Sequence, residues 1–158
     1  MSESPLNAPA PVAETAETIL SPEEAFQQGL ERYKAGEAAS ALIPVFKEIC
    51  DRAAKSGAAW TCLSWLYLMD NRPSLALKAA KRAVKLAPQD AQSRVNLAIA
   101  MLETKQKGVR QQIEAIEQLM MVDEGASEEI SSNLEEGLAR NPDCKGITRV
   151  QSWLFGDA

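Results

Sequence analysis

The chain has 158 residues, of which 46% are hydrophobic and 25% charged, and its formal net charge is −5. These values are ordinary for one globular domain in water, and no apolar run approaches the roughly 18 residues of a membrane-spanning helix. The sequence has no histidine, the commonest general base and metal ligand, and it contains no recognisable catalytic motif. We therefore expect no enzymatic activity, no metal and no cofactor. Because the N-terminus lacks an apolar leader segment, we also expect a cytoplasmic protein.

Three cysteines, Cys50, Cys62 and Cys144, are spread along the chain without a CxxC spacing. An odd number of scattered thiols argues against a disulfide framework, and without histidine they do not complete a structural zinc site. Cys50 and Cys62 fall in apolar segments and are expected in the core. Cys144 lies in a polar turn, so it is expected to be the accessible thiol.

The first 20 residues are rich in Pro, Ala, Ser, Thr and Glu. Such a segment buries too little apolar surface to offset the cost of ordering, so a disordered N-terminal tail is predicted over residues 1–20. The folded helical domain is expected over residues 21–156. Ser21 and Glu24 have the spacing of a capping box, and Pro22 fits the first position of a helix.

Two helices are predicted next. Phe26, Leu30 and Tyr33 recur at helical spacing, and Gly36 ends that helix. The second helix is predicted from an apolar stripe of Leu42, Val45, Phe46 and Ile49. Pro44 lies within this stripe and has no backbone N–H, so the helix is expected either to begin late, near Ala41, or to kink at Pro44.

Two helices are predicted in the middle of the chain, one almost entirely apolar and one with a charged face. Residues 58–69 are apolar nearly all round, which indicates a helix that is buried on several sides. Residues 73–86 predict a helix with one basic face, on which four cations recur at helical spacing: Lys78, Lys81, Arg82 and Lys85. Pro88 then turns the chain, and Asp90 has the residue type of a helix N-cap.

The last third predicts further helices. One begins near Ala91, and it either runs long or ends in a loop around Gly108. The next carries Ile113, Ile116, Leu119 and Met120. A following helix is expected to start at Ser127, and its apolar stripe consists of Ile130, Leu134 and Leu138. After a turn at Asn141-Pro142, a final helix is predicted from Ile147, Val150 and Leu154.

One segment in the middle of the chain carries a specific pattern, which reads Trp60, Leu63, Ser64, Tyr67, Ala76, Ala80, Ala83 and Pro88. This spacing resembles one repeat of the tetratricopeptide repeat (TPR) family, a helix–turn–helix unit of about 34 residues. The resemblance is clearest over residues 57–90 and degenerate over 22–55 and 91–124. Ser64 replaces the family's Gly and Ala80 its aromatic, and both are small enough for close helix packing.

The resemblance implies an all-α fold, namely a TPR-like right-handed helical solenoid of about three helix pairs. One such pair cannot bury its own apolar face, so neighbouring pairs must stack on it. The helical segments beyond residue 125 are expected to cap the end of the stack.

In a solenoid of this kind, the first helix of each pair lines a concave groove. The positions that map onto this groove are mostly large and apolar: Phe26, Leu30, Tyr33, Thr61, Trp65, Leu68, Met69, Val95, Ile99 and Leu102. Apolar surface of this extent usually marks a binding site, here for an apolar peptide or an amphipathic helix of another protein. The alternative is that the chain fills its own groove, with the helix near 147–154 or with the tail around 6–20.

Some TPR proteins bind the C-terminal carboxylate of heat-shock chaperones through a clamp of Lys, Asn and Arg. The matching positions in this chain hold neither Lys nor Arg, since they read Phe26, Leu30, Cys62, Gln92 and Asn96. A carboxylate ligand needs charged donors, so this specialised function is not expected.

The basic face formed by Lys78, Lys81, Arg82 and Lys85 has two interpretations. It could bind an acidic protein, RNA phosphates or anionic headgroups, or it could be the solvated outer face of a second helix. Without interleaved aromatic residues it is weak evidence for nucleic-acid binding. The predicted function is therefore a non-enzymatic adaptor, chaperone or complex-assembly factor that binds an apolar partner segment. The alternative is a permanent structural subunit that docks through the basic face.

Overall fold

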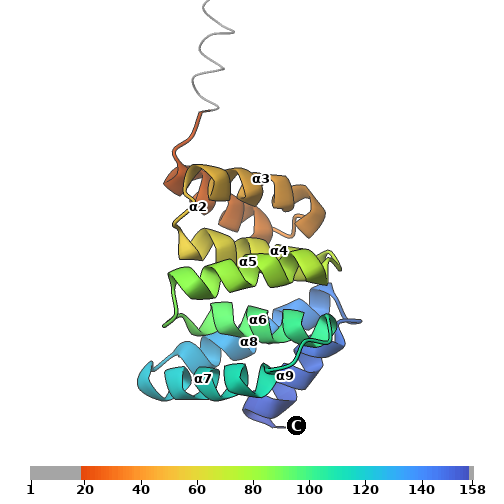
Figure 1. Cartoon of the computed structure of the whole chain (residues 1–158). Helices are drawn as coiled ribbons and strands as arrows, with labels where there is room; N and C mark the ends of the chain where they lie inside the picture. The colour runs from red at the N-terminus through yellow and green to blue at the C-terminus, as the bar shows by residue number, and fades with distance from the viewer. Residues whose placement is uncertain (1–18, 157–158) are drawn as a thin grey trace, which may run out of the picture.

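The computed structural model describes residues 19–156, which contain eight helices and no strand (Figure 1). Six of the helices form three consecutive pairs: α2 (Pro22–Lys34) with α3 (Ala39–Arg52), α4 (Gly57–Met69) with α5 (Pro73–Leu86), and α6 (Ala91–Glu103) with α7 (Val109–Val122). Two further helices follow, α8 (Ala126–Arg140) and α9 (Lys145–Phe155). The predicted all-α solenoid of three pairs with additional C-terminal helices is confirmed. The predicted disorder concerns residues that lie, apart from 19 and 20, outside the described part.

The first helix begins as its sequence predicts. The Ser21 hydroxyl accepts a hydrogen bond from the Glu24 backbone at 3.1 Å, and the Glu24 carboxylate accepts one from the Ser21 backbone at 3.0 Å. These bonds, above all the one from the Ser21 backbone, lower the pKa of Glu24. At its other end α2 stops at Gly36, whose φ of 98° is one that residues with a side chain rarely adopt.

Small residues set how closely the helices approach one another. The buried side chains of α5 are all alanines, Ala76, Ala79, Ala80 and Ala83, so its neighbours pack almost against its backbone. Gly29 of α2 lies against the ring of Phe46, and a Cβ added there would lie only 2.7 Å from a ring carbon. The pairs therefore stack through apolar surfaces with little spare room.

The second helix differs from its prediction. α3 begins at Ala39 and continues through Pro44, so a late start near Ala41 is wrong. Pro44 is exposed, and it lies inside the helix, where its missing N–H removes one bond of the backbone ladder.

Two later boundaries are settled by glycines. α6 ends at Glu103, just before Lys105 with its positive φ of 60°, and the loop that follows ends at Gly108, whose φ of 98° directly precedes α7. α8 begins at Ala126 behind Gly125, which has a φ of 108°, so Ser127 does not cap this helix.

The last two helices do not continue the stack as a fourth pair. The first helices of the three pairs, α2, α4 and α6, form one side of the stack, and α3, α5 and α7 form the other, which faces the viewer in Figure 1. α8 packs on α6, α7 and α9 and reaches the end of α2 through Arg140 and α4 through Gly137, while α9 packs mainly on α6 and α8. Within residues 19–156, no helix has both the length and the apolar character that crossing a bilayer requires.

Candidate functional site

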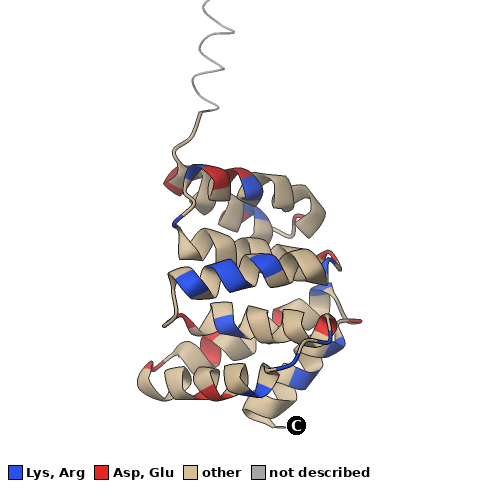
Figure 2. Cartoon of the chain, in the orientation of Figure 1, with Lys and Arg blue, Asp and Glu red and all other residues tan. Residues whose placement is uncertain are grey.

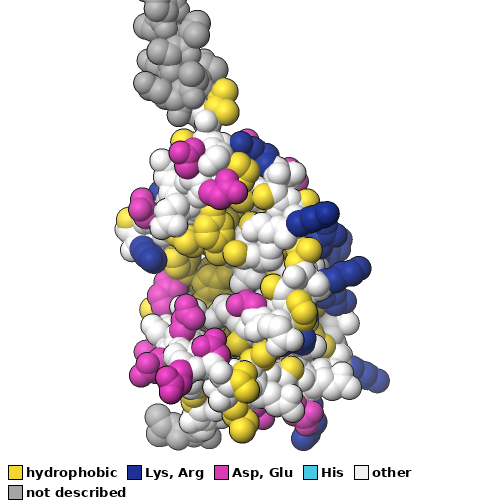
Figure 3. Space-filling model, turned by 90° about the vertical axis from the view of Figure 1, so that its left-hand side faces the viewer, with side chains coloured by type: hydrophobic (Ala, Val, Ile, Leu, Met, Phe, Trp, Pro, Cys, Tyr) yellow, Lys and Arg dark blue, Asp and Glu magenta, His cyan; other side chains and the backbone are white. Residues whose placement is uncertain are grey.

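A groove of about 570 Å³ opens between the first helices of the three pairs and α8. Its apolar surface comes from α2, α3 and α4, through Leu30, Phe46, Cys62, Trp65 and Leu66. Its polar border comes mainly from α6 and α8, through Gln92, Asn96, Glu129, Ser132, Asn133, Glu136 and Arg140. Figure 3 shows a hollow with hydrophobic side chains at its bottom and acidic side chains along one side. We call this feature the groove.

Four of the ten predicted groove residues line it, namely Leu30, Tyr33, Thr61 and Trp65. Phe26 lies beside the lining and packs edge to face on Phe46, with ring centroids 5.7 Å apart. Leu102 is half-buried and does not belong to the lining.

The remaining four predicted residues are buried in the core and do not face open space: Leu68, Met69, Val95 and Ile99. The physical reason is that the chain continues over them. Gly146, at the start of α9, approaches so closely that an added Cβ would lie 3.2 Å from Ile99. The exposure expected for these four residues is therefore wrong, because the C-terminal segment covers α6 at Gly146 and the end of α4 at Asn141.

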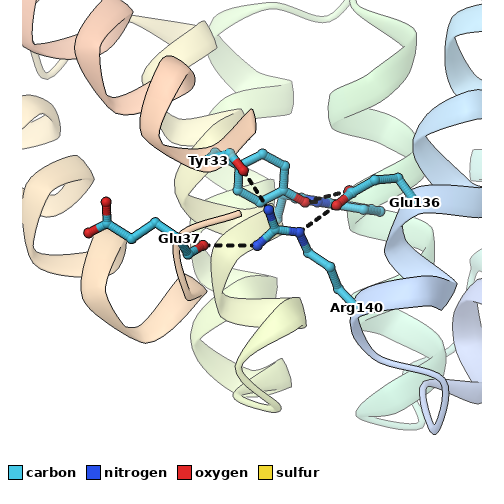
Figure 4. A network of polar contacts seen from close by, with 5 residues as sticks. Tyr33, Glu37, Glu136 and Arg140 are labelled. Carbon is cyan, nitrogen blue, oxygen red and sulfur yellow. Dashed lines mark hydrogen bonds and ion pairs between the residues drawn. The ribbon is translucent and has the colours of Figure 1, made fainter. Parts of the chain in front are cut away.

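Arg140, the last residue of α8, joins this helix to the end of α2 (Figure 4). Its guanidinium donates hydrogen bonds to the backbone carbonyls of Tyr33 and Glu37 and lies 3.7 Å from the centroid of the Tyr33 ring. It also forms an ion pair with Glu136, one turn earlier in α8. Carbonyls at a helix C-terminus carry partial negative charge, so a cation placed there is stabilising.

The next residue makes the equivalent contact with α4. The Asn141 amide donates to the backbone carbonyl of Leu68 and to the side chain of Asn71, both at 3.0 Å. Further along, the backbone N–H of Gly146 donates to Glu103, at the end of α6, at 2.7 Å. Residues 140–146 thus bind the C-terminal ends of α2, α4 and α6 in turn, and this fixes α8 over the groove.

Tyr33 links α8 to the bottom of the groove. Its hydroxyl donates to Glu136 at 2.5 Å and accepts from the Trp65 indole N–H at 2.8 Å. Burial, followed by the hydrogen bond to Glu136, raises the pKa of Tyr33 above its ordinary value. The hydroxyl is therefore protonated at neutral pH and available as the donor to Glu136.

Trp65 lies directly beneath α8. A Cβ added to Gly137 would lie 2.7 Å from two carbons of the Trp65 ring, so only glycine allows this contact. The helix that covers part of the groove is thus α8, and not the segment near 147–154 that the sequence suggested. The alternative that the N-terminal tail fills the groove concerns residues that lie almost entirely outside the described part of the chain. α8 narrows the groove, which stays open beside it.

Amide side chains form the border of the groove at α6. Gln92 donates to Asn96 at 2.8 Å and accepts from Asn133 of α8 at 2.9 Å. Asn96 donates to the Thr61 carbonyl and to the Ser64 hydroxyl, both at 3.0 Å. Among the positions that correspond to the carboxylate clamp, Gln92 and Asn96 are uncharged and bind each other. Arg140, one of the cations in the lining, already binds the carbonyls at the end of α2 and the carboxylate of Glu136.

The thiols differ from their predicted placement at Cys144 and at Cys62. Cys144 is buried, because it lies at the packed junction between α8 and α9, so its predicted accessibility is wrong. Burial raises the pKa of Cys144 to about 11 and that of Cys50 to about 12. Cys62 is half-buried in the groove, and burial raises its pKa to about 12. In residues 19–156 no three His, Cys, Asp or Glu side chains gather as a metal site would require.

The basic face of α5 lies on the other side of the stack (Figure 2). All four of its cations, Lys78, Lys81, Arg82 and Lys85, are exposed. The Arg82 guanidinium lies 5.6 Å from the centroid of the Trp60 ring, and Trp60 is itself half-buried.

Sequence reasoning missed the part of the groove that α8 supplies. The missed residues recur three or four apart along one helix face: Glu129, Ser132, Asn133, Glu136 and Arg140. A polar stripe with this period is the normal signature of a solvent-facing helix surface. The helical spacing of these polar residues can be read from the sequence. It does not distinguish a helix that forms the wall of a groove from a helix that faces only solvent.

Neither a family model nor a curated protein matches the sequence. Among solved structures, the chain is similar to one described as the MamA RS-1 ArsTM double mutant, with a TM-score of 0.55. The two are 20% identical, and the match covers 85% of this chain and 73% of that chain. At this identity the likeness concerns the fold alone. MamA is a TPR-like protein, so the fold of this chain is a TPR-like helical solenoid.

Proposed function

We propose that the chain is a non-enzymatic protein–protein interaction adaptor, which binds an apolar segment of a partner protein in the groove. The observation that carries the proposal is the groove itself, an apolar surface of α2 and α4 that stays open although α8 crosses it. Its volume of about 570 Å³ lies within the usual range of specific binding sites, roughly 300 to 1,000 Å³.

The shape of the groove favours a short segment over a long helix. α8 already occupies the place in which a long partner helix would lie, and Gly137 holds it against Trp65. Apolar side chains of a partner would enter between α4 and α8, while its backbone would face the polar border near Gln92 and Ser132. Roles as a chaperone or as a cytoplasmic assembly factor are finer forms of the same proposal.

A bulky residue on α8 tests the proposal without touching the core. Ser132 is exposed and lines the groove, whereas Ser127 is exposed on the same helix outside the lining. Ser132→Trp should block the groove and Ser127→Trp should leave it open. Tagged wild type and both variants are used to capture proteins from native extract, and the captured proteins are quantified by mass spectrometry.

The expected result is a partner that wild type and Ser127→Trp retain equally and that Ser132→Trp loses by at least about tenfold, or about 1.4 kcal/mol. A partner retained by all three proteins would bind elsewhere, and the proposal for the groove would then be wrong. Circular dichroism of the three proteins shows whether the fold is unchanged.

A further inference from the structure

A second cavity lies on the opposite side of the stack from the groove. It has a volume of about 360 Å³ and opens between α3 and α5, with α4 beneath. Trp60, Leu63 and Leu75 give it apolar walls, and almost all of its surface is apolar. Leu75 is 40% exposed, which makes it one of the few large apolar side chains of the stack that water reaches.

The rim of this cavity is positively charged. Lys47 of α3 and Lys78 and Arg82 of α5 line it, against one carboxylate, Asp51. Lys81 and Lys85 continue the positive charge along α5, and both are exposed. The combination of an apolar cavity with a cationic rim is absent from the groove, whose lining holds two cations and two carboxylates.

We propose that this cavity is a second docking site, which takes an acidic segment of a partner protein anchored by one apolar side chain. The apolar side chain enters between Trp60 and Leu75, and flanking carboxylates pair with Lys78 and Arg82. The charge complementarity raises the association rate and selects against basic partners. The site is independent of the groove, so the chain would bind two different partner segments, one on each side of the stack.

The structure favours a protein segment over nucleic acid. Trp60, the aromatic residue of the cavity that borders the cations, already has Arg82 over its ring. Tyr67, the other aromatic residue of the lining, is buried, so bases find little aromatic surface to stack on at this site. Asp51 in the lining and the net charge of −5 further disfavour a long polyanion.

The test uses the full chain and a short synthetic peptide of Asp, Glu and Ser around one central Phe. Binding is followed by two-dimensional NMR of the tryptophan indole N–H groups, each assigned from its Trp→Phe variant. The Trp60 indole donates to the Ala54 carbonyl beside the cavity, whereas the Trp65 indole donates to Tyr33 in the groove. A shift of the Trp60 signal alone therefore reports the second site, and the groove is judged separately from Trp65.

The peptide should shift the Trp60 signal, and replacing its Phe by Ser should weaken binding at least about tenfold. Lys78→Glu with Arg82→Glu should do the same, while the matched reversal of Lys107 and Arg110, both exposed elsewhere, should change the affinity less than about threefold. Equal binding of the Ser peptide, or of a double-stranded DNA, would overturn the proposal in favour of unspecific charge attraction. Absence of any Trp60 shift would overturn it as well.

The N-terminal tail is the remaining candidate occupant, because residues 1–20 contain three Glu and neither Lys nor Arg. Neutralising Glu3, Glu14 and Glu17 to Gln in the full chain separates the two cases. An unchanged affinity for the Phe peptide supports an external partner. An affinity that rises at least about tenfold would show that the chain's own tail competes for the cavity, and the proposal of a partner would fail.

Discussion

The contacts inside the stack of α2 to α7 differ in kind from the contacts that hold the end of α8 on α2. Within the stack, apolar surfaces meet through small residues, as Gly29 meets Phe46 and as the alanines of α5 meet their neighbours. α8 reaches α2 and α4 through a polar network around Tyr33, Glu136 and Arg140.

The difference matters because the two kinds of contact have different energies. A buried apolar contact contributes in proportion to the area removed from water. A hydrogen bond exchanged with water contributes only about 1 kcal/mol net, and the Glu136 side chain is 42% exposed, so its ion pair is partly screened. We infer that the end of α8 near Arg140, which meets α2 through polar contacts, yields before the stack does, whereas Ile130 and Leu134 bury the rest of α8 in the core.

The largest expected effect is on the stack. Phe46 is 1% exposed and fills the space between α2 and α3, so Phe46→Ala should lower the free energy of unfolding by about 3 to 5 kcal/mol. Urea denaturation measures this loss. A loss below about 1 kcal/mol would mean that the first pair is loosely packed, and the contrast with α8 would disappear.

A smaller effect is expected where α8 meets α2. Arg140→Met keeps the apolar part of the side chain but removes its donors to Tyr33 and Glu37, so it should cost about 2 to 3 kcal/mol. Amide hydrogen exchange should become faster in α8 than in α4. Arg110→Met, at an exposed position of α7, is the control and should cost less than about 0.5 kcal/mol. Equal costs for the two variants would show that the network does not hold α8.

The smallest effect is expected for Tyr33→Phe, about 1 kcal/mol at pH 8, because the Glu136 acceptor and the Trp65 donor lose one partner each. The pKa of Tyr33 is raised in the folded chain, so its contribution is fully present below the unfolded pKa of about 10 and is lost as the pH rises through the folded value. The difference in stability between wild type and variant should therefore narrow between pH 9 and about pH 11. A difference that stays constant or widens over this range would contradict the raised pKa of a buried Tyr33 hydroxyl.

The sequence predicted the stack well because its packing is periodic. Ser21 with Glu24, Gly36 and the alanines of α5 are local signals, and each determines a boundary or a helix face within a few residues of itself. The TPR-like spacing from Trp60 to Pro88 further predicted that the helices pair and that the pairs stack.

The position of α8 could not be predicted in this way. It depends on Arg140 finding the carbonyl of Tyr33, which is 107 residues away in the sequence, and on Gly137 leaving room for Trp65. A glycine and an arginine near the end of a helix are common, and neither residue type indicates which distant residue it will contact. The groove was therefore predicted as more apolar than it is, and its residues in α6 were expected to be exposed.

The most direct test of the account is the environment of Trp65 when the partner binds. Its indole N–H donates to Tyr33 at the bottom of the groove, whereas Trp153 is 44% exposed on α9 and belongs to neither cavity. A peptide from the partner that Ser132→Trp fails to capture is added to the wild-type chain, and the indole signals are followed by NMR. The account predicts that the Trp65 signal shifts while the Trp153 signal stays. A shift of Trp153 alone, with Trp65 unchanged at saturation, would contradict it.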